Sequence, residues 1–241
     1  MKGIVCVNNY NHDENAVRLF NFFKEYYPTY ILDTFHKEKG GKLPIDDDNI
    51  IYLDNIYEGG LFLKDYDLVK ENNADYMLSI ESDVLINDEN LQRLKKSFNR
   101  IMDVGDVGVY QPSLTRGSSS YGTSALTQSN SQYFNSGTNQ FRNAYRIEGW
   151  CKIVDRKVLD GIMPHISPID NKYGWGIDCA LCRMAIKLGK RIVVDDTVMV
   201  THPLGCGYST LAAQAEYFNF RKRYKELGIL FPEEDENNIK D

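Results

Sequence analysis

The chain has 241 residues, of which 42% are hydrophobic, and its 16 Tyr and 11 Phe supply enough apolar surface for the core of one domain. Its formal net charge of -6 argues against a protein built around a broad basic surface, such as a non-specific nucleic-acid binder. A nucleic-acid partner that is reached through a local basic patch stays open.

Cysteine usage and hydropathy indicate the cellular setting. The chain has five Cys, an odd number without the spacing of a disulfide framework, which favours a reducing compartment. The apolar run at residues 3–7 is too short for the core of a signal peptide. No stretch approaches the roughly 20 apolar residues of a membrane span. We therefore expect a cytoplasmic protein without a transmembrane segment.

Short apolar runs alternate with segments of helical period. The runs that are typical of strands are residues 3–7, 30–32, 50–53, 76–80, 107–110, 146–154, 191–194 and 197–201. The helical spacing of apolar residues predicts helices over residues 14–26, 61–71, 89–102, 156–163, 179–188 and 210–227. This alternation predicts an α/β fold with an open, mostly parallel, Rossmann-like sheet flanked by helices.

The composition changes in the middle of the chain. Residues 117–143 are dominated by Ser, Thr, Asn, Gln and Gly and show no clear period. Long loops inside a compact domain are usually functional or mobile. We expect a lid over a substrate cleft, with a featureless mobile loop as the alternative.

Two acidic residues follow the strand predicted at residues 76–80. Glu81 and Asp83 are one residue apart, so their side chains point to the same side of an extended chain. The carboxyl end of a strand is where open α/β sheets bind ligands. Paired carboxylates suit Mg²⁺ or Mn²⁺, which often share their ligands with substrate phosphates. The alternative is a strand end with solvated acids.

Other predicted strands also end in polar residues. Asn8 and Asn9 follow the first strand and Asp33 follows the second, so parallel strands would place them on one edge with Asp83. The glycine motifs G-x-x-x-x-G-K-[ST] and G-x-G-x-x-G are missing after the first strand, which disfavours P-loop enzymes and dinucleotide dehydrogenases. The pattern predicts a nucleotide pocket without a phosphate loop.

Together these residues resemble the GT-A fold glycosyltransferases of family 2, which use nucleotide-diphosphate sugars. The resemblance covers the chain from Gly3 to about Tyr208. Glu81-Ser82-Asp83 is similar to the DxD motif of that family, and Asp33 matches in position its base-contacting acid. The run from Asp178 to His202 is similar to the stretch from the family's "ED" motif to its closing histidine, and residues 146–161 resemble its acceptor-side segment.

The resemblance implies a metal-dependent enzyme that moves a sugar from a nucleotide-diphosphate donor, a UDP-sugar first of all, to an acceptor hydroxyl. It implies a nucleotide-sugar-binding half over residues 1–110, a lid over 111–145, and an acceptor-side and catalytic half with a small acceptor-side subregion over 146–241 of a single domain. The donor-binding residues would be Asn8, Asp33, Gly60, Lys64, Glu81, Ser82 and Asp83.

The resemblance also implies the remaining roles. Mn²⁺ or Mg²⁺ would be held by Asp83 and His202, together with Glu81. Asp178 would be the general base of an inverting reaction, because direct in-line attack by a hydroxyl needs a base. The acceptor-binding residues would be Trp150, Tyr173, Trp175 and Gly176. Two departures bear on these roles: Glu81 stands for the usual first Asp, and Ile177 stands for the usual Glu before Asp178.

Most of these residues also have a purely structural interpretation. His202 would then be a turn residue before Pro203, and Asp178 a helix N-cap. The aromatic residues would be core, and the basic residues that could contact a diphosphate would be solvated charges; these basic residues are Lys64, Arg142 and Arg146.

Two other function classes stay open. A nucleotidyltransferase that makes a nucleotide sugar would need a glycine-rich basic loop after the first strand, and residues 8–15 contain no Gly. A binding module that kept the fold and lost turnover is the other class. The acceptor is equally open: a saccharide, a lipid-linked glycan, a protein side chain or, as an outside candidate, modified DNA.

Overall fold

The computed structural model describes residues 1–115, 141–203, 208–226 and 228. The lid expected between residues 111 and 145 therefore lies largely outside the described residues, as does the glycine-rich turn at 204–207. In the described part, the strands form one eight-stranded sheet. They are β1 (Gly3–Asn9), β2 (Thr29–Asp33), β3 (Ile50–Tyr52), β4 (Tyr76–Glu81), β5 (Val107–Leu114), β6 (Phe141–Asn143), β7 (Cys151–Asp155) and β8 (Arg191–Val200).

The strand order is β3-β2-β1-β4-β7-β5-β8-β6. β1, β2, β3 and β4 pair in parallel, and so do β5 and β8. β7 runs antiparallel between β4 and β5, and β6 runs antiparallel at the edge beside β8. The sheet is therefore open and mostly parallel, which confirms the predicted fold class.

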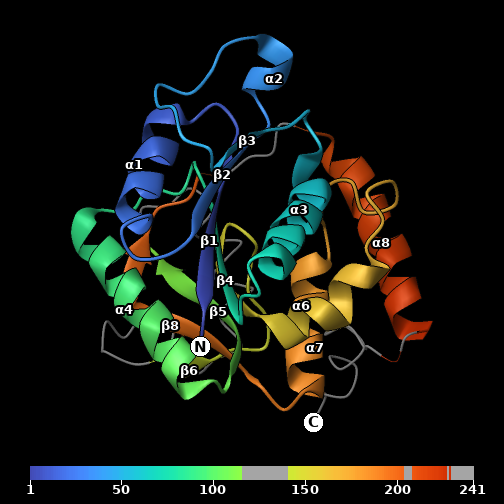
Figure 1. Ribbon diagram of the computed structural model, residues 1–241. Helices are drawn as coiled ribbons and strands as arrows, with labels where there is room; N and C mark the ends of the chain where they lie inside the picture. The colour runs from blue at the N-terminus through green and yellow to red at the C-terminus, as the bar shows by residue number, and fades with distance from the viewer. Residues whose placement is uncertain (116–140, 204–207, 227, 229–241) are drawn as a thin grey trace.

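Helices cover both faces of the sheet (Figure 1). α1 (Asp13–Phe23) and α4 (Asp88–Val104) lie on one face, and α3 (Tyr57–Glu71), α6 (Arg156–Ile162) and α7 (Ile177–Lys187) lie on the other. α8 (Thr210–Glu226) packs outside α3 and α7, and α2 (His36–Lys39) is a single turn after β2. A 3-10 turn, Met163–His165, follows α6.

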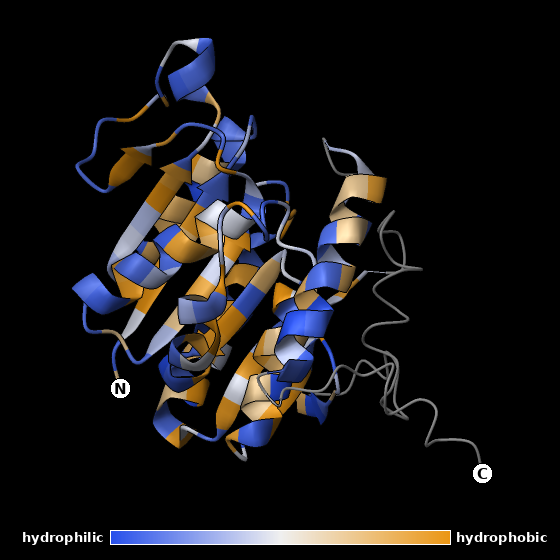
Figure 2. Ribbon diagram, turned by 90° about the vertical axis from the view of Figure 1, so that its right-hand side faces the viewer, coloured by the Kyte–Doolittle hydropathy of each residue, from blue (hydrophilic) through white to orange (hydrophobic). Residues whose placement is uncertain are grey.

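The two faces of β1 explain its uninterrupted apolar sequence. Val5 and Val7 belong to the core under α1 and α4, whereas Ile4 and Cys6 belong to the core under α3, α6 and α7. A strand that is buried on both faces reads as a continuous apolar run. Figure 2 shows the same arrangement, with hydrophobic strands at the centre and hydrophilic residues on the outer surfaces of the helices.

Several predicted element boundaries are wrong. β8 is one strand over 191–200 where two were expected, because the intervening acids Asp195 and Asp196 are buried and hydrogen-bonded. β7 begins at Cys151 rather than at 146. β5 continues past Pro112 through a register shift, and residues 141–143, expected in a loop, form β6.

No helix of the described residues is long and apolar enough to cross a membrane. The C-x-x-C pair, Cys179 and Cys182, is buried in α7 among apolar side chains.

Candidate active site

The carboxyl ends of the parallel strands bring the predicted polar residues together. Asn8 of β1 is paired in register with Glu81 of β4, and Asn9 with Asp33 of β2. The end of β8 joins this edge through Thr201, whose backbone exchanges hydrogen bonds of 2.9 and 2.8 Å with Leu85. Residues that are more than a hundred positions apart thus meet at one edge.

Glu81, Asp83 and His202 form a compact cluster at this edge. One ligand atom from each lies within 4.8 Å of the others. His202 Nε2 is 3.6 Å from Glu81 Oε2 and 3.7 Å from Asp83 Oδ1. Apart from this contact, Asp83 Oδ1 is buried without a hydrogen-bond donor among the described residues. Two carboxylates and an imidazole are a donor set that fits Mn²⁺ or Mg²⁺.

The charges of the cluster act on one another. Burial raises the pKa of the Asp83 carboxyl and Glu81 raises it further, whereas His202 and His12 lower it. Burial by itself would lower the pKa of His202, but its hydrogen bond to Glu81 and the nearby charges raise that pKa. A divalent cation would relieve the repulsion between the carboxylates, since it favours their charged forms.

Trp150 packs against the cluster of Glu81, Asp83 and His202. Its ring stacks on His202 with centroids 5.6 Å apart and an interplanar angle of 20°. The indole N–H donates to Glu148 Oε2 at 2.8 Å, and the backbone N–H of Glu81 donates to the Trp150 carbonyl at 2.9 Å. Only 4% of Trp150 is exposed. This burial is typical of a core residue that orients His202, and it does not match the predicted role of Trp150 as an open platform for the acceptor.

Asp178 lies in the first turn of α7. Gly176, with a φ of 93°, occupies the N-cap position without a side-chain cap, so the N-cap interpretation of Asp178 is wrong. Asp178 Oδ1 is buried and has no hydrogen-bond partner in the described part of the chain. Burial raises the pKa of Asp178 to about 6, against the opposing charges of Lys152 and Arg146. A carboxylate with that pKa can accept a proton near neutral pH.

Glu58 is a further acid of the site that the sequence analysis missed. It lies in the first turn of α3, which begins at Tyr57 and not at residue 61 as predicted. A Cβ placed on Gly149 would lie 2.7 Å from Glu58 Oε1 and 3.1 Å from Asp178 Oδ1. Burial raises the pKa of Glu58 well above its usual value, and the charges of Glu81 and Asp178 raise it further.

Lys152 is the buried cation among these acids, and the sequence analysis missed it as well. Only 2% of the residue is exposed, and its Nζ donates to the Gly149 carbonyl at 2.6 Å and lies 3.8 Å from the Phe62 ring centroid. Its charge counteracts the rise of the pKa values of Glu58 and Asp178. Lys152 therefore offsets part of the negative charge at this edge.

The predicted donor-side residues are mostly buried supports. Asp33 is fully buried and accepts hydrogen bonds from Asn9 Nδ2 at 2.7 Å and from the His36 backbone N–H at 2.8 Å. Asn8 Nδ2 donates to Ser79 Oγ at 3.2 Å and, at 3.4 Å, to a carboxylate of α3. Donor contacts by these side chains stay predictions.

The remaining donor-side positions differ in exposure. Ser82 is buried, with 2% of its surface exposed. Gly60 is buried in α3, and a Cβ there would lie 2.6 Å from Ile56. Lys64 is half-buried on the same helix. Arg142, considered as a diphosphate contact, is instead paired in the sheet with Asp196, at 2.9 Å from Nε to Oδ2.

Two of the predicted acceptor-side aromatic residues, Tyr173 and Trp175, lie together away from Trp150, and their binding of an acceptor stays a prediction. Tyr173 stacks on Tyr208 with ring centroids 4.7 Å apart. The ring centroid of Tyr57 lies 5.4 Å from that of Tyr173. Trp175 joins them, because its indole N–H donates to the Tyr208 hydroxyl at 2.9 Å. Gly176 at the start of α7 leaves room for an aromatic ring of α8. These residues line the α3, α7 and α8 side of the edge.

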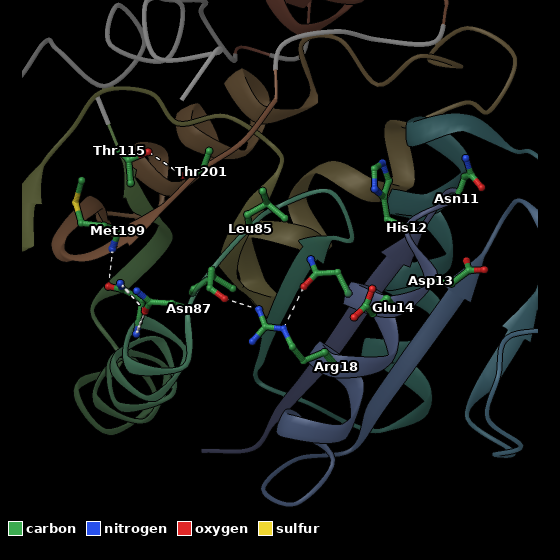
Figure 3. Close-up of a pocket in the computed structure, with 13 residues that line it drawn as sticks. Asn11, His12, Asp13, Glu14, Arg18, Leu85, Asn87, Thr115, Met199 and Thr201 are labelled. Carbon is green, nitrogen blue, oxygen red and sulfur yellow. Dashed lines mark hydrogen bonds between the residues drawn. The ribbon is translucent and has the colours of Figure 1, made fainter. Parts of the chain in front are cut away.

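A groove of about 940 Å³ opens on the α1 and α4 side of the same edge (Figure 3). Leu85 and Thr201 line it, and they are close in sequence to Asp83 and His202. Leu85 is 58% exposed. His12, which also lines the groove, is near enough to lower the pKa of Asp83. The groove and Asp178 thus lie on opposite faces of the sheet, with the metal-type cluster between them.

No protein-family model matches the chain, and no curated protein matches it in sequence. Among solved structures, the chain is similar to GalNAc-T7 in a crystal structure with UDP, GalNAc and Mn²⁺, with a TM-score of 0.60 at 8% sequence identity. The protein has the GT-A fold. The match covers 92% of this chain and 48% of that chain, so the chain spans about half the length of this relative.

Two further solved structures are similar at lower TM-scores. One is mannose-1-phosphate geranyltransferase from Thermus thermophilus, at 0.46 and 11% identity, with 84% of this chain and 75% of that chain covered. The other is CMP:2-keto-3-deoxy-manno-octonic acid synthetase complexed with CTP, at 0.49 and 12% identity, with 93% and 100% covered. At such identities the likeness concerns the fold, and function has to be argued from the site.

Proposed function

We propose that the protein is a metal-dependent glycosyltransferase that moves a sugar from a nucleotide-diphosphate donor, a UDP-sugar first of all, to an acceptor hydroxyl with inversion. The observation that carries this proposal is the cluster of Glu81, Asp83 and His202 beside Asp178, a separate carboxylate with a raised pKa. The cluster suits a divalent ion, and Asp178 suits a base, at one edge of a GT-A sheet.

The residues divide the reaction between them. Glu81, Asp83 and His202 would hold Mn²⁺ or Mg²⁺, which would neutralise the charge that develops on the leaving diphosphate. Asp178 would accept the proton of the acceptor hydroxyl. At the same time, the oxygen of that hydroxyl would form a bond to the anomeric carbon of the donor, and the bond from that carbon to the phosphate oxygen would break. Trp150 would keep the His202 ring in place by stacking.

The groove at α1 and α4 supports this division of the site. In an in-line displacement the leaving group departs on the side opposite the attacking hydroxyl, and Asp178 and the groove lie on opposite faces of the sheet. We therefore place the leaving nucleoside diphosphate at the groove, where His12 and the exposed Leu85 border the metal-type cluster.

A donor screen tests the proposal. The protein is incubated with Mn²⁺ and a panel of nucleotide sugars, and the released nucleoside diphosphate is measured. We expect release with one donor class, its loss in EDTA, and a loss of at least about 100-fold for Asp83→Asn. Asp103→Asn, at an exposed position of α4, is the matched control and should keep full activity.

The same screen separates the two alternatives. A nucleotidyltransferase would release pyrophosphate from a nucleoside triphosphate and a sugar phosphate, and would release no nucleoside diphosphate from the panel. Donor binding by calorimetry without any release would indicate a binding module. Full activity of Asp83→Asn in EDTA would contradict metal-dependent transfer.

A further inference from the structure

The segment at residues 173–176 leads into the helix that carries the proposed base. It begins with Tyr173 and ends where α7 starts, and Asp178 lies in the first turn of that helix. Gly174 has a φ of 74° and Gly176 a φ of 93°. With two glycines in the left-handed region, the segment is neither strand nor helix, so its position depends on contacts with other parts of the chain.

Glu216 of α8 binds this segment through the backbone. Both of its carboxylate oxygens accept the Tyr173 N–H, at 2.8 and 3.1 Å. No other acceptor for this N–H lies among the described residues, and only 8% of Glu216 is exposed. Losing a shielded acceptor leaves the N–H unsatisfied, which is unfavourable. The bond therefore ties the segment to α8.

The start of α8 makes further contacts with the same segment. Tyr208 stacks on Tyr173 with ring centroids 4.7 Å apart, and its hydroxyl accepts the Trp175 indole N–H at 2.9 Å. A Cβ on Gly176 would lie 2.9 Å from the ring of Tyr217, which is the residue after Glu216 in the helix. Residues 173, 175 and 176 thus all contact α8 or the residues just before it.

We infer that Glu216 is a positioning residue for the acceptor side of the reaction. It acts through the Tyr173 N–H and keeps the segment at 173–176, and with it the start of α7, in the arrangement that acceptor transfer needs. This inference rests on the proposed function, which gives Asp178 its role as the base. The metal-type cluster lies at the ends of β4 and β8, so a change at Glu216 should affect the acceptor and leave donor binding unchanged.

The contact requires an oxygen acceptor, and a charge is not essential for it. A carboxylate, a carboxylic acid and a primary amide each offer an oxygen that accepts from an N–H. Glu216→Gln therefore keeps the hydrogen bond to Tyr173, whereas Glu216→Ala removes it. Comparison of these two variants tests the bond itself.

The test measures the acceptor and the donor separately. With Mn²⁺ and the donor found in the screen, transfer is measured to methyl hexopyranosides, a serine-containing peptide and hydroxymethylated duplex DNA. We expect Glu216→Ala to lose about 10- to 100-fold in kcat/KM for the acceptor, because small displacements of a positioned group have effects of this size. Its KM for the donor should stay unchanged. Glu216→Gln should restore most of the loss, and Gln214→Ala, at an exposed position of α8, is the matched control.

Two further measurements report the position of the segment. Gly176→Ala pushes the segment away from α8 without altering Glu216, and it should cause the same acceptor-specific loss. Trp175 is one of two Trp in the chain, so its fluorescence can be followed. Emission should move to longer wavelength in Glu216→Ala, as the indole becomes more exposed, and stay at the wild-type position in Glu216→Gln. The shift should be missing when Glu216→Ala is combined with Trp175→Phe.

The possible failures are distinguishable. Equal losses for donor and acceptor in Glu216→Ala, wild-type acceptor kcat/KM in that variant, no rescue by Glu216→Gln, or an unchanged emission would each overturn this inference while the proposed function stands. Absence of nucleoside diphosphate release by the wild type, or release without transfer to any acceptor of the panel, would overturn the proposed function and this inference with it.

Discussion

The proposed role of Asp178 as the general base depends on its buried position in the first turn of α7. Its burial raises its pKa to about 6, although Lys152 and Arg146 oppose the rise. The charged form is the one that accepts a proton, so activity should increase as the pH rises through about 6 and should reach a plateau above about 7. The pH profile of kcat/KM, measured at saturating Mn²⁺, checks this.

Replacing Asp178 tests whether its carboxyl group causes the increase in activity near pH 6. Asp178→Asn should lower kcat by at least about 100-fold and remove the limb, since general bases contribute in this range. Glu148→Gln removes a charge that raises the pKa of Asp178 and should move this limb to lower pH, while the amide oxygen can still accept the indole N–H of Trp150. If the residual activity of Asp178→Asn still increased near pH 6, the increase would be due to the titration of another group.

At this scale the sequence was informative where a residue belongs to a motif. Glu81, Asp83, Asp178 and His202 were all expected at the site, because their spacing resembles a family pattern. Glu58 gave no such signal: its position depends on contacts of Gly59 and Gly174 with segments far along the chain. Such contacts arise from packing and leave no local pattern that a single sequence displays.

The start of α3 packs on the loop at 171–174, which carries the proposed acceptor-side residue Tyr173. Gly59→Ala would place a methyl group 1.7 Å from the Asn171 carbonyl oxygen, so the helix or the loop has to shift. We expect the free energy of unfolding to fall by about 1–3 kcal/mol. Urea unfolding measures this. Glu71→Ala, at the exposed end of the same helix, is the control, and an equal effect of both would show that the packing is loose.

A buried glutamate of α8, Glu216, forms hydrogen bonds with the loop at 171–174. The Glu216 carboxylate accepts the Tyr173 N–H at 2.8 and 3.1 Å, and burial raises its pKa to about 7. The folded state therefore holds this proton up to a higher pH than the unfolded chain, and the associated stability is lost as the pH rises through about 7.

Glu216→Gln should remove that dependence. Between pH 5 and pH 8, the free energy of unfolding of the variant relative to the wild type should increase by about 2 kcal/mol, after allowance for screening of the carboxylate by solvent. Chemical unfolding at the two pH values gives this difference and cancels the contributions of the other acids. A difference that does not change with pH would show that Glu216 is already ionised at pH 5.

Among the elements, the parallel half of the sheet was the most predictable. β1 and β4 are apolar runs buried on both faces, and their ends were placed within a residue or two. β8 was read as two strands, since Asp195 and Asp196 suggest a turn when their buried partners are unknown. These partners, Tyr110 and Arg142 among them, lie more than fifty residues away.

Metal binding should be visible in the stability of the whole molecule. Asp83 has a raised pKa because it is buried beside Glu81, so the folded protein carries a repulsion that a divalent cation would relieve. A ligand that binds the folded state alone stabilises it by mass action. Mn²⁺ should therefore raise the Tm of the wild type and not that of Asp83→Asn, as followed by circular dichroism at pH 7.5. An equal increase in both would place the ion elsewhere.

The antiparallel strand β7 has a consequence for how the chain is made. It separates β4 from β5 in the sheet, yet it follows both of them in the sequence. During synthesis from the N-terminus, β4 therefore carries an unpaired edge until residue 155 has emerged, and β5 is available earlier as a competing partner. Exposed strand edges favour mispairing and aggregation. The segment that brings Trp150 and Gly149 to the site is thus also the one whose late arrival completes the centre of the sheet.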